Sequence, residues 1–285
     1  MAEKIDSRAV GLDVGLAFIR WLTGAENLHY GFWTGLDVTA GNLKAAQEAY
    51  TAKLFGYLPE GRLRILDIGG GAGETARKLI DLGHEVQIVV PSAFLAQRCR
   101  KNAPGAVVHE CTFEDFTGTG PFDLCLFSES FQYIPLAESL PKCAALLAPG
   151  GQVLVADCFR TEAYKGRQAH GPQPGGGHPL AAFRKALNRS AFRVAAEEDI
   201  TDAVAPSIDL EQQLFNVIGH AVTRVSDEIR AKKPAAHWTL GRFIGLFLSK
   251  KRRANLMRRL TGTDRNAQAF RRFNRYLILR LEQTA

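Results

Sequence analysis

Short apolar segments alternate with amphipathic segments through the middle of the chain. Stretches such as ETARKLIDLG (74–83) and SAFLAQRCRKN (92–102) are expected to be helices. Strands that alternate with helices of this length predict βαβ units and a parallel sheet with right-handed crossovers. We therefore predict an α/β fold with a Rossmann-like, doubly wound and mostly parallel sheet. The segments expected to form its strands are RLRILDIG, EVQIVV, AVVHECT, FDLCLFSES, QVLVADCF, FRVAAEEDIT and RYLILRL.

The pattern divides the chain into four parts. Residues 1–60 are expected to form an N-terminal helical lid, and residues 61–205 the core sheet with its helices. Residues 206–266 are too long a helical stretch for a simple crossover, so we expect a helical cap inserted before the last strand. Residues 267–285 then supply the final strand of the core sheet. Residues 159–182 are rich in glycine and proline, which at this length is typical of a lid, a binding loop or a disordered segment.

Composition limits the class of protein. The 285 residues hold no apolar run of the ~18–20 residues that a membrane span needs, and five scattered cysteines without a CxxC pair favour free thiols. We therefore expect a cytoplasmic protein. The net charge of +7 is concentrated in residues 230–280. A basic region of this kind is compatible with a solvated helix face, an anionic membrane surface, nucleic acid or an acidic substrate.

A glycine-rich segment follows the first predicted core strand. Asp67 ends the strand, and glycines stand at positions 69, 70, 71 and 73 before the next helix. Glycines allow a sharp turn and let a ligand lie against the bare main chain, and the carboxyl end of the first strand is where such sheets bind ligands. An acid two residues before the first glycine is awkward for a pyrophosphate but suits a ligand that carries an amino group.

Three segments in the same order and spacing resemble the motifs of class I S-adenosylmethionine-dependent methyltransferases. They are LDIGGGAGETA, FDLCLFSESFQYI and LLAPGGQVLVADCF. The segments NLHYGFWTG (27–35) and SESFQYIP (128–135) are similar to those of small-molecule methyltransferases that act on tocopherol precursors, sterols or glycine derivatives. The resemblance implies S-adenosyl-L-methionine as cofactor.

The resemblance also implies a set of residues that contact the cofactor. Asp67 is expected at its amino end, and Tyr30 is expected to close the methionine end, where an aromatic face suits a sulfonium. The alternative for Tyr30, Phe32 and Trp33 is a hydrophobic staple that fastens the N-terminal helix. Relatives usually end the second strand with an acid that binds the ribose, but this chain has Val90 there, and Thr112 stands where another acid often meets the adenine. The expected cofactor contacts are Tyr30, Asp67, Gly69, Gly70, Gly71, Gly73, Ser92, Thr112, Phe113 and Ser128.

Catalytic candidates come from the turn after the fourth strand and from the glycine-rich loop. Glu129 is predicted to contact cofactor or substrate, with capping of the next helix as the alternative. Tyr133 stands where many relatives place a histidine and is expected to orient the substrate. His178 and His170 are candidates for a base, with exposed loop histidines as the alternative. The histidines show no ligand spacing, so we predict no metal.

The leading hypothesis is a methyltransferase that acts on a small, apolar metabolite: a lipid, quinone, polyketide or aromatic, with O-methylation preferred. The alternative is a non-catalytic protein that binds S-adenosylmethionine, its demethylated product or another small molecule on the same scaffold. No (D/N)PP(Y/F) target-base motif follows the fourth strand, which disfavours nucleic acid. Contact of the basic C-terminal helices with a membrane surface, and a homodimer, stay open.

Overall fold

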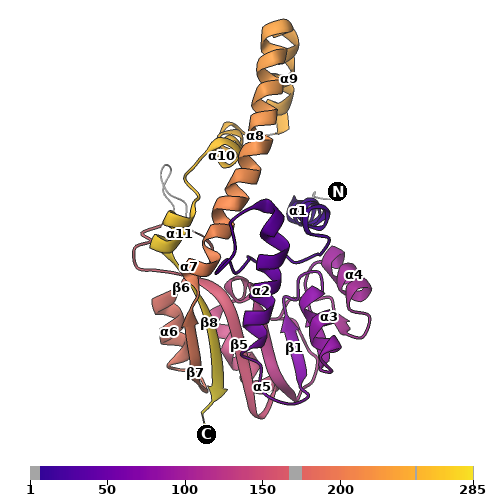
Figure 1. Cartoon of the computed structure of the whole chain (residues 1–285), viewed down its shortest axis with the longest axis vertical. Helices are drawn as coiled ribbons and strands as arrows, with labels where there is room; N and C mark the ends of the chain where they lie inside the picture. Colours follow the sequence, from indigo (N-terminus) through magenta and orange to yellow (C-terminus); the bar gives the residue numbers. More distant parts are fainter. Residues whose placement is uncertain (1–6, 167–174, 248, 285) are drawn as a thin grey trace.

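An eight-stranded sheet forms the centre of the molecule in the computed structural model, which describes residues 7–166, 175–247 and 249–284 (Figure 1). Its order is β3-β2-β1-β4-β5-β8-β7, with the short β6 paired to β5. The pairs from β3 to β5 are parallel, and β8 runs antiparallel to both β5 and β7. The prediction of a Rossmann-like, mostly parallel sheet is confirmed. The strands are β1 (Arg64–Ile68), β2 (Glu85–Val89), β3 (Val107–His109), β4 (Phe122–Ser128), β5 (Leu147–Arg160), β6 (His178–Pro179), β7 (Phe192–Asp199) and β8 (Asn274–Gln283).

Apolar residues on both faces of the sheet explain why its strands are nearly continuous hydrophobic runs. In β1, Ile65 packs into the cluster on one face, whereas Leu66 and Ile68 pack into the cluster on the other. β2 alternates in the same way, with Ile88 on the first face and Val89 on the second. Helices cover both faces of a sheet built like this. Ligands therefore bind at the carboxyl ends of its parallel strands.

Helices flank the sheet and extend beyond it. They are α1 (Ser7–Thr23), α2 (Leu43–Phe55), α3 (Glu74–Asp81), α4 (Ala93–Asn102), α5 (Leu136–Leu146), α6 (Leu180–Leu187), α7 (Thr201–Val204), α8 (Pro206–Lys232), α9 (Pro234–Phe247), α10 (Lys250–Thr261) and α11 (Ala267–Phe273), with short 3₁₀ turns at Ala40–Asn42 and Phe131–Tyr133. Within the described ranges, none of these helices is long and apolar enough to cross a membrane.

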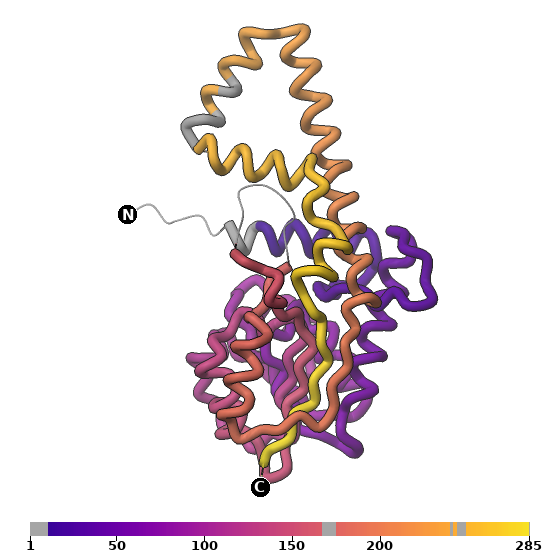
Figure 2. The backbone as a smooth tube through the Cα atoms, turned by 90° about the vertical axis from the view of Figure 1, so that its left-hand side faces the viewer, coloured from indigo at the N-terminus to yellow at the C-terminus, as the bar shows by residue number. Residues whose placement is uncertain are grey.

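The helices α8, α9 and α10 form an arm rather than the cap that the sequence predicted. α8 has 27 residues, which at 1.5 Å per residue is about 40 Å. Its buried residues lie in the first half, from Ser207 to Gly219, and the second half projects away from the sheet together with α9 (Figures 1 and 2). Trp238 and Phe243, both on α9, are 61% and 58% exposed. Of the arm, only its base therefore lies against the rest of the molecule.

Two local predictions are wrong for reasons visible in the chain. Residues 267–273, expected within the last strand, form α11, because the side chain of Asn266 accepts a hydrogen bond from the Ala269 amide and caps a helix. The loop predicted for residues 159–182 already ends at β6, where His178 pairs with Phe159 of β5. The histidine candidate at position 170 lies outside the described residues.

Candidate functional site

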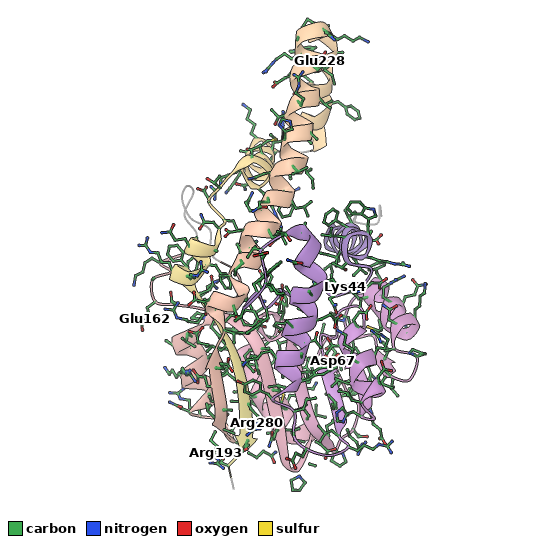
Figure 3. All side chains as sticks on the ribbon, in the orientation of Figure 1. Lys44, Asp67, Glu162, Arg193, Glu228 and Arg280 are labelled. Carbon is green, nitrogen blue, oxygen red and sulfur yellow. The ribbon has the colours of Figure 1, made fainter. Side chains whose placement is uncertain are left out.

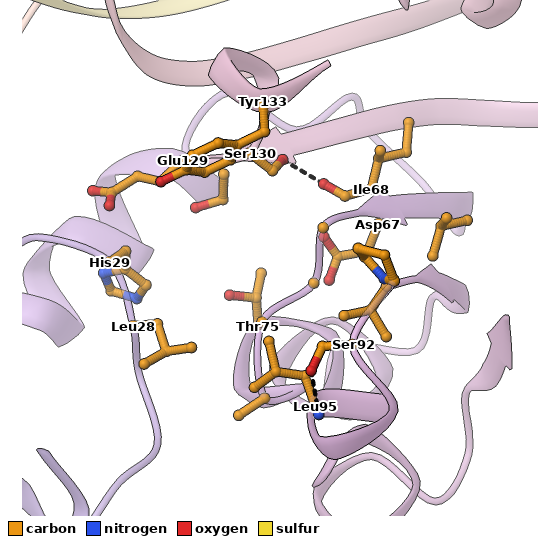
Figure 4. A pocket seen from close by; sticks show the side chains of 18 of the residues that line it. Leu28, His29, Asp67, Ile68, Thr75, Ser92, Leu95, Glu129, Ser130 and Tyr133 are labelled. Carbon is orange, nitrogen blue, oxygen red and sulfur yellow. Dashed lines mark hydrogen bonds between the residues drawn. The ribbon is translucent and has the colours of Figure 1, made fainter. Parts of the chain in front are cut away.

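A cavity of about 540 Å³ lies at the carboxyl ends of β1, β2 and β4. Its wall brings together the N-terminal segment, the glycine-rich loop and the turns that follow β2, β3 and β4. Figure 4 shows Glu129 and His29 on one side of this cavity and Asp67 and Ser92 on the other. Of the described residues that line it, none is lysine or arginine. The described wall of the cavity therefore contains carboxyl groups but no lysine or arginine.

The glycines of the loop are required for different structural reasons. A Cβ at Gly69 would lie 2.3 Å from the Cβ of Ser130, one at Gly70 would lie 2.6 Å from Asp67 Oδ2, and one at Gly73 would lie 2.9 Å from the Cα of Cys99. These three positions are closed by protein. A Cβ at Gly71 would meet only Leu28, at 3.8 Å, although its φ of +56° favours glycine. Gly71 is therefore the position at which bare backbone faces the cavity.

Asp67 is buried at the end of β1, with 1% of its surface exposed. Its Oδ2 is buried and has no hydrogen-bond partner in the described part of the chain. Removal of the carboxyl from water raises its pKa to about 7. A buried carboxylate without a partner is costly, so this oxygen is the clearest sign that a positively charged or donor group belongs in the cavity.

Glu129 follows β4 and has the unusual φ of 58° for a residue that is not glycine. Its Oε1 accepts hydrogen bonds from the Tyr30 amide at 2.8 Å and the Tyr276 hydroxyl at 3.0 Å. Burial raises the pKa of Glu129 to about 8, against the opposing effect of these hydrogen bonds. The predicted alternative of a helix cap has no support here, because Pro135, six residues later, is the residue that precedes α5.

A chain of hydroxyl groups connects Glu129 with Ser128. The Tyr276 hydroxyl, which donates to Glu129, lies 2.8 Å from the Tyr50 hydroxyl, and that group lies 3.2 Å from Ser128 Oγ. Ser128 lines the cavity, as predicted for a cofactor contact. The two tyrosines come from α2 and β8, so they position the turn after β4 from behind.

The segment before Tyr30 supplies site residues that the sequence analysis did not assign. Glu26, Asn27, Leu28 and His29 line the cavity. Glu26 accepts hydrogen bonds from Arg98 and Asn102 of α4, which ties the segment to the core. Asn27 is 2% exposed, and neither polar atom of its side chain has a partner among the described residues. The signal was present in the motif NLHYGFWTG, of which we assigned only the tyrosine.

His29 is held as a neutral ring. Its Nδ1 donates to the Tyr30 carbonyl at 2.8 Å, and the ring stacks on Tyr50 with 4.4 Å between centroids. Burial lowers its pKa to about 4. A neutral imidazole in the wall does not repel a cation at neutral pH.

The Tyr30 side chain points away from the cavity that we expected it to close. Its ring packs edge-on against Phe270, and its hydroxyl accepts a hydrogen bond from Arg265 at 3.4 Å. Tyr30 belongs to the site through its backbone, because its amide donates to Glu129. A direct contact between its ring and a cofactor stays a prediction.

The turns after β2 and β3 contribute three of the predicted contacts. Ser92, Thr112 and Phe113 all line the cavity. The Ser92 hydroxyl accepts from the Leu95 amide at 3.4 Å and caps α4, and the Thr112 hydroxyl donates to Asp115 at 2.8 Å. Val90 is 2% exposed and packs into the core cluster of β2, so its position offers a ribose no hydrogen bond.

The two remaining catalytic candidates differ in their position relative to the cavity. Tyr133 lines the cavity and is 67% exposed, so it is placed at the mouth. His178 lies outside the lining, and its Nε2 donates to the carbonyls of Phe131 and Ile134 at 3.1 and 2.9 Å. These bonds fasten β6 under the turn after β4, which is a positioning role. Among the described residues no cluster of three His, Cys, Asp or Glu side chains could hold a metal.

Comparison with known proteins shows what the part of the chain around this cavity is similar to. Residues 65–151 match the family model described as a methyltransferase domain. The chain is 35% identical over 120 residues to a ubiquinone biosynthesis O-methyltransferase of a Caulobacter species, covering 37% of this chain and 45% of that protein. It is 31% identical over 159 residues to an uncharacterised methyltransferase of Geobacillus kaustophilus, covering 54% and 62%. The matches thus span about half the length of these relatives.

A solved structure extends the likeness to the whole fold. The geranyl diphosphate C-methyltransferase of Streptomyces coelicolor, solved with S-adenosyl-L-homocysteine, superposes with a TM-score of 0.61. The alignment covers 94% of this chain and 92% of that one at 14% identity, which shows a shared fold alone. The predicted recognition of a class I S-adenosylmethionine-dependent methyltransferase domain is confirmed.

Proposed function

Because residues 65–151 are a methyltransferase domain, we propose that this chain transfers a methyl group from S-adenosyl-L-methionine to a small, apolar metabolite. One observation carries the proposal. Asp67 and Glu129 are among the residues that line the cavity over the glycine-rich loop, and no described lysine or arginine lines it. A cofactor with an ammonium group and a sulfonium centre is the kind of ligand that such a wall favours.

The residues present fit this cofactor. Asp67 has a buried oxygen without a partner, which an ammonium group would satisfy. Gly71 leaves open space where any other residue would place a side chain. Asn27 offers a buried amide without a partner, and Ser92 and Thr112 offer hydroxyls at the end where Val90 offers none.

The chain's contribution to methyl transfer follows from these positions. The cofactor would supply a methyl group bound to a cationic sulfur. An in-line nucleophile would attack this methyl group, with the sulfur as the leaving group. Glu129 is a base of suitable strength, because its raised pKa of about 8 lies near neutral pH. For a hydroxyl acceptor, its carboxylate would take the proton as the oxygen–methyl bond forms. The bonds from Tyr30 and Tyr276 hold Glu129 in one orientation.

The acceptor class rests on the lining and on the relatives. Leu12, Leu28 and Ile134 are apolar members of the wall, which suits a lipid, quinone, polyketide or aromatic. One matched relative is named for ubiquinone biosynthesis and one neighbour for geranyl diphosphate. We prefer O-methylation, because Glu129 can serve as a base for a hydroxyl acceptor. The charged residues among the described lining are carboxyls, of which Asp67 suits the cofactor.

The alternative is a protein that binds the cofactor or its product without catalysis. The lack of an acid at Val90 keeps this alternative open, because it removes one charge-assisted hydrogen bond worth about 1.5–3 kcal/mol.

A methylation assay decides between the two. The purified chain is incubated with S-adenosylmethionine that carries an isotopic methyl label and with a cell extract, and products are found by mass spectrometry. We expect labelled small molecules that are missing with Glu129→Gln. Binding of S-adenosylhomocysteine without any labelled product would favour the non-catalytic alternative.

The proposal includes partners and location. The exposed Trp238 and Phe243 stand on the same arm as the basic run of residues 250–253, an arrangement that favours contact with an anionic membrane surface. All five cysteines are unpaired, which fits a reducing cytoplasm. Fractionation of cells that express a tagged chain tests the location. A homodimer stays an open prediction that sedimentation can test.

A further inference from the structure

A second cavity of about 540 Å³ lies beyond the end of β5, between the sheet and the base of the arm. Its wall contains four arginines but a single acidic residue, Asp264. The arginines are Arg160, Arg258, Arg259 and Arg265. This cavity therefore has the opposite electrostatic character from the cavity over the glycine loop.

The acidic groups near this cavity do not balance the arginines. Glu211 contacts both Arg265, at 2.6 Å, and Arg259, at 3.5 Å, and Asp264 lies 3.6 Å from Arg258. Two carboxylates therefore serve three guanidinium groups. The fourth, that of Arg160, has no carboxylate within ion-pair distance in the described part of the chain. The wall thus keeps an excess of positive charge.

Two of the arginines have donors that are buried and unused. The Nε atoms of Arg160 and Arg265 are buried and have no hydrogen-bond partner among the described residues. A guanidinium donates in a fixed fork, which matches the oxygens of a carboxylate or a phosphate. Buried donors without partners are uncommon unless a ligand satisfies them.

The cavity is built from fixed elements. Arg160 ends β5, and its guanidinium lies 4.9 Å from the ring centroid of Tyr164. Opposite, Gly175 and Gly176 form a wall of bare backbone that Asn274 holds by two hydrogen bonds of 2.9 Å. A site with a stacked arginine and a fixed backbone wall needs little ordering when a ligand binds.

Tyr30 connects this cavity to the proposed methyl-transfer site. Its hydroxyl accepts from Arg265, which lines the second cavity, while its amide donates to Glu129, which lines the first. Gln132 makes a similar connection, because a Cβ on Gly176 would lie 2.0 Å from its Oε1, next to the turn of Glu129. Tyr30 therefore separates the second cavity from the proposed base by the length of a single residue.

We propose that the arginine-lined cavity binds an anionic group, a carboxylate or a phosphate, of the methyl acceptor. That the bound anion is part of the methyl acceptor rests on the proposed function. The binding of an anion in this cavity does not depend on it. It narrows the acceptor to an apolar metabolite that carries an acidic group at one end.

Calorimetric titration of the full chain with three probes of similar shape tests this proposal. The probes are benzoate, phenyl phosphate and the neutral benzamide. We expect at least one of the two acids to bind and benzamide not to bind. Binding of one acid alone identifies the anionic group as a carboxylate or a phosphate.

Matched variants locate the binding. Arg160→Gln should weaken the acid at least tenfold, and Arg160→Lys, which keeps the charge but loses the fork, should give an intermediate loss. Arg193→Gln removes the same charge at the opposite end of the sheet (Figure 3) and should change the affinity less than twofold. Melting curves confirm that each variant is folded.

Three results would overturn the proposal: neither acid binds, benzamide binds as tightly as benzoate, or Arg160→Gln binds as the parent does. A parallel titration with S-adenosylhomocysteine separates this failure from that of the proposed function. Arg160→Gln should leave the affinity for S-adenosylhomocysteine unchanged. A parent chain that binds an acid but not S-adenosylhomocysteine would contradict the proposed function and would still support the anion site.

Discussion

At the scale of single residues, three acids with raised pKa values stand at the carboxyl edge of the sheet. Burial raises the pKa of Asp67 and Asp157 to about 7 and that of Glu129 to about 8. Asp157 accepts hydrogen bonds from the amides of Gln132 and Cys158, so its carboxyl already has donors. Glu129 likewise accepts from the Tyr30 amide and the Tyr276 hydroxyl, whereas Asp67 Oδ2 has no partner among the described residues. Of the three, Asp67 is therefore the acid that a cationic ligand would satisfy.

Asp67 should make cofactor binding depend on pH. An ammonium group favours the ionised carboxyl, so below the pKa of about 7 binding must release a proton. We expect the affinity for S-adenosylhomocysteine to rise as pH increases from about 5 to 7, by at most tenfold per unit, and then to level off. Calorimetry over this range measures the effect.

Asp67→Asn should remove this pH dependence and weaken binding above pH 7. Asp81→Asn is the control, since Asp81 lies in an exposed ion pair with Arg77. A change of less than about twofold in Asp67→Asn, or ~0.4 kcal/mol, would mean that Asp67 only supports the glycine loop.

Glu129→Gln tests the proposed base. The amide oxygen of glutamine can still accept from Tyr30 and Tyr276, so the fold and cofactor binding should be kept. The rate of methyl transfer should fall about 100-fold, and the rise of the rate with pH that ionisation of Glu129 produces should vanish. Initial rates across pH measure both. An unchanged rate would show that the acceptor needs no base from this residue.

At the scale of elements, the sequence predicted the core well and the arm poorly. The apolar runs of β1, β2, β4 and β5 are buried on both faces, so their hydrophobic pattern is enough to identify them. The same pattern cannot say whether α8 lies on the sheet or leaves it. The position of α8 depends on tertiary contacts, and its buried residues all lie in its first half.

In the site too, local motifs were predictable from the sequence and contacts between distant segments were not. Asp67 and the glycine loop were predictable, because their chemistry is carried by a local motif. Asn27 and His29 act through contacts with α2, where Gln47 donates to the carbonyls of both residues. No local pattern shows such a contact between distant segments.

A close crossing fixes α10 against α8. A Cβ at Gly219 would lie 2.2 Å from the carbonyl oxygen of Leu260, so the two backbones touch there. We expect Gly219→Val to separate the helices and to increase hydrogen exchange of the α10 amides, as measured by mass spectrometry. His220→Val, at an exposed neighbouring position, is the control. Equal protection of α10 in both variants would contradict this role for Gly219.

At the scale of the whole molecule, a basic segment stands apart from the carboxyl-lined cavity. The lysines and arginines of residues 250–253 are exposed on α10, and none of them lines that cavity. Exposed apolar residues accompany them, among them Trp238 and Phe243. The division places a surface for an anionic partner away from the proposed chemistry.

The arm should therefore bind anionic vesicles. We expect co-sedimentation with vesicles that contain phosphatidylserine, weak binding to phosphatidylcholine alone, and loss of binding as salt increases. Replacement of the four basic residues at 250–253 by glutamine should abolish the effect, whereas Arg193→Gln should not. Equal binding to both vesicle types would contradict the electrostatic part of this prediction.

The central claim is that the cavity over the glycine loop binds the cofactor. Calorimetric titration with S-adenosylhomocysteine tests it most directly, with Gly71→Val and Gly83→Val as matched variants. Both positions have positive φ and open space, so both variants carry backbone strain of about 1–3 kcal/mol, but only Gly71 lines the cavity. The account predicts one site per chain, kept in Gly83→Val and lost in Gly71→Val. A parent chain that does not bind, or a Gly71→Val variant that is folded and binds as tightly as Gly83→Val, would contradict it.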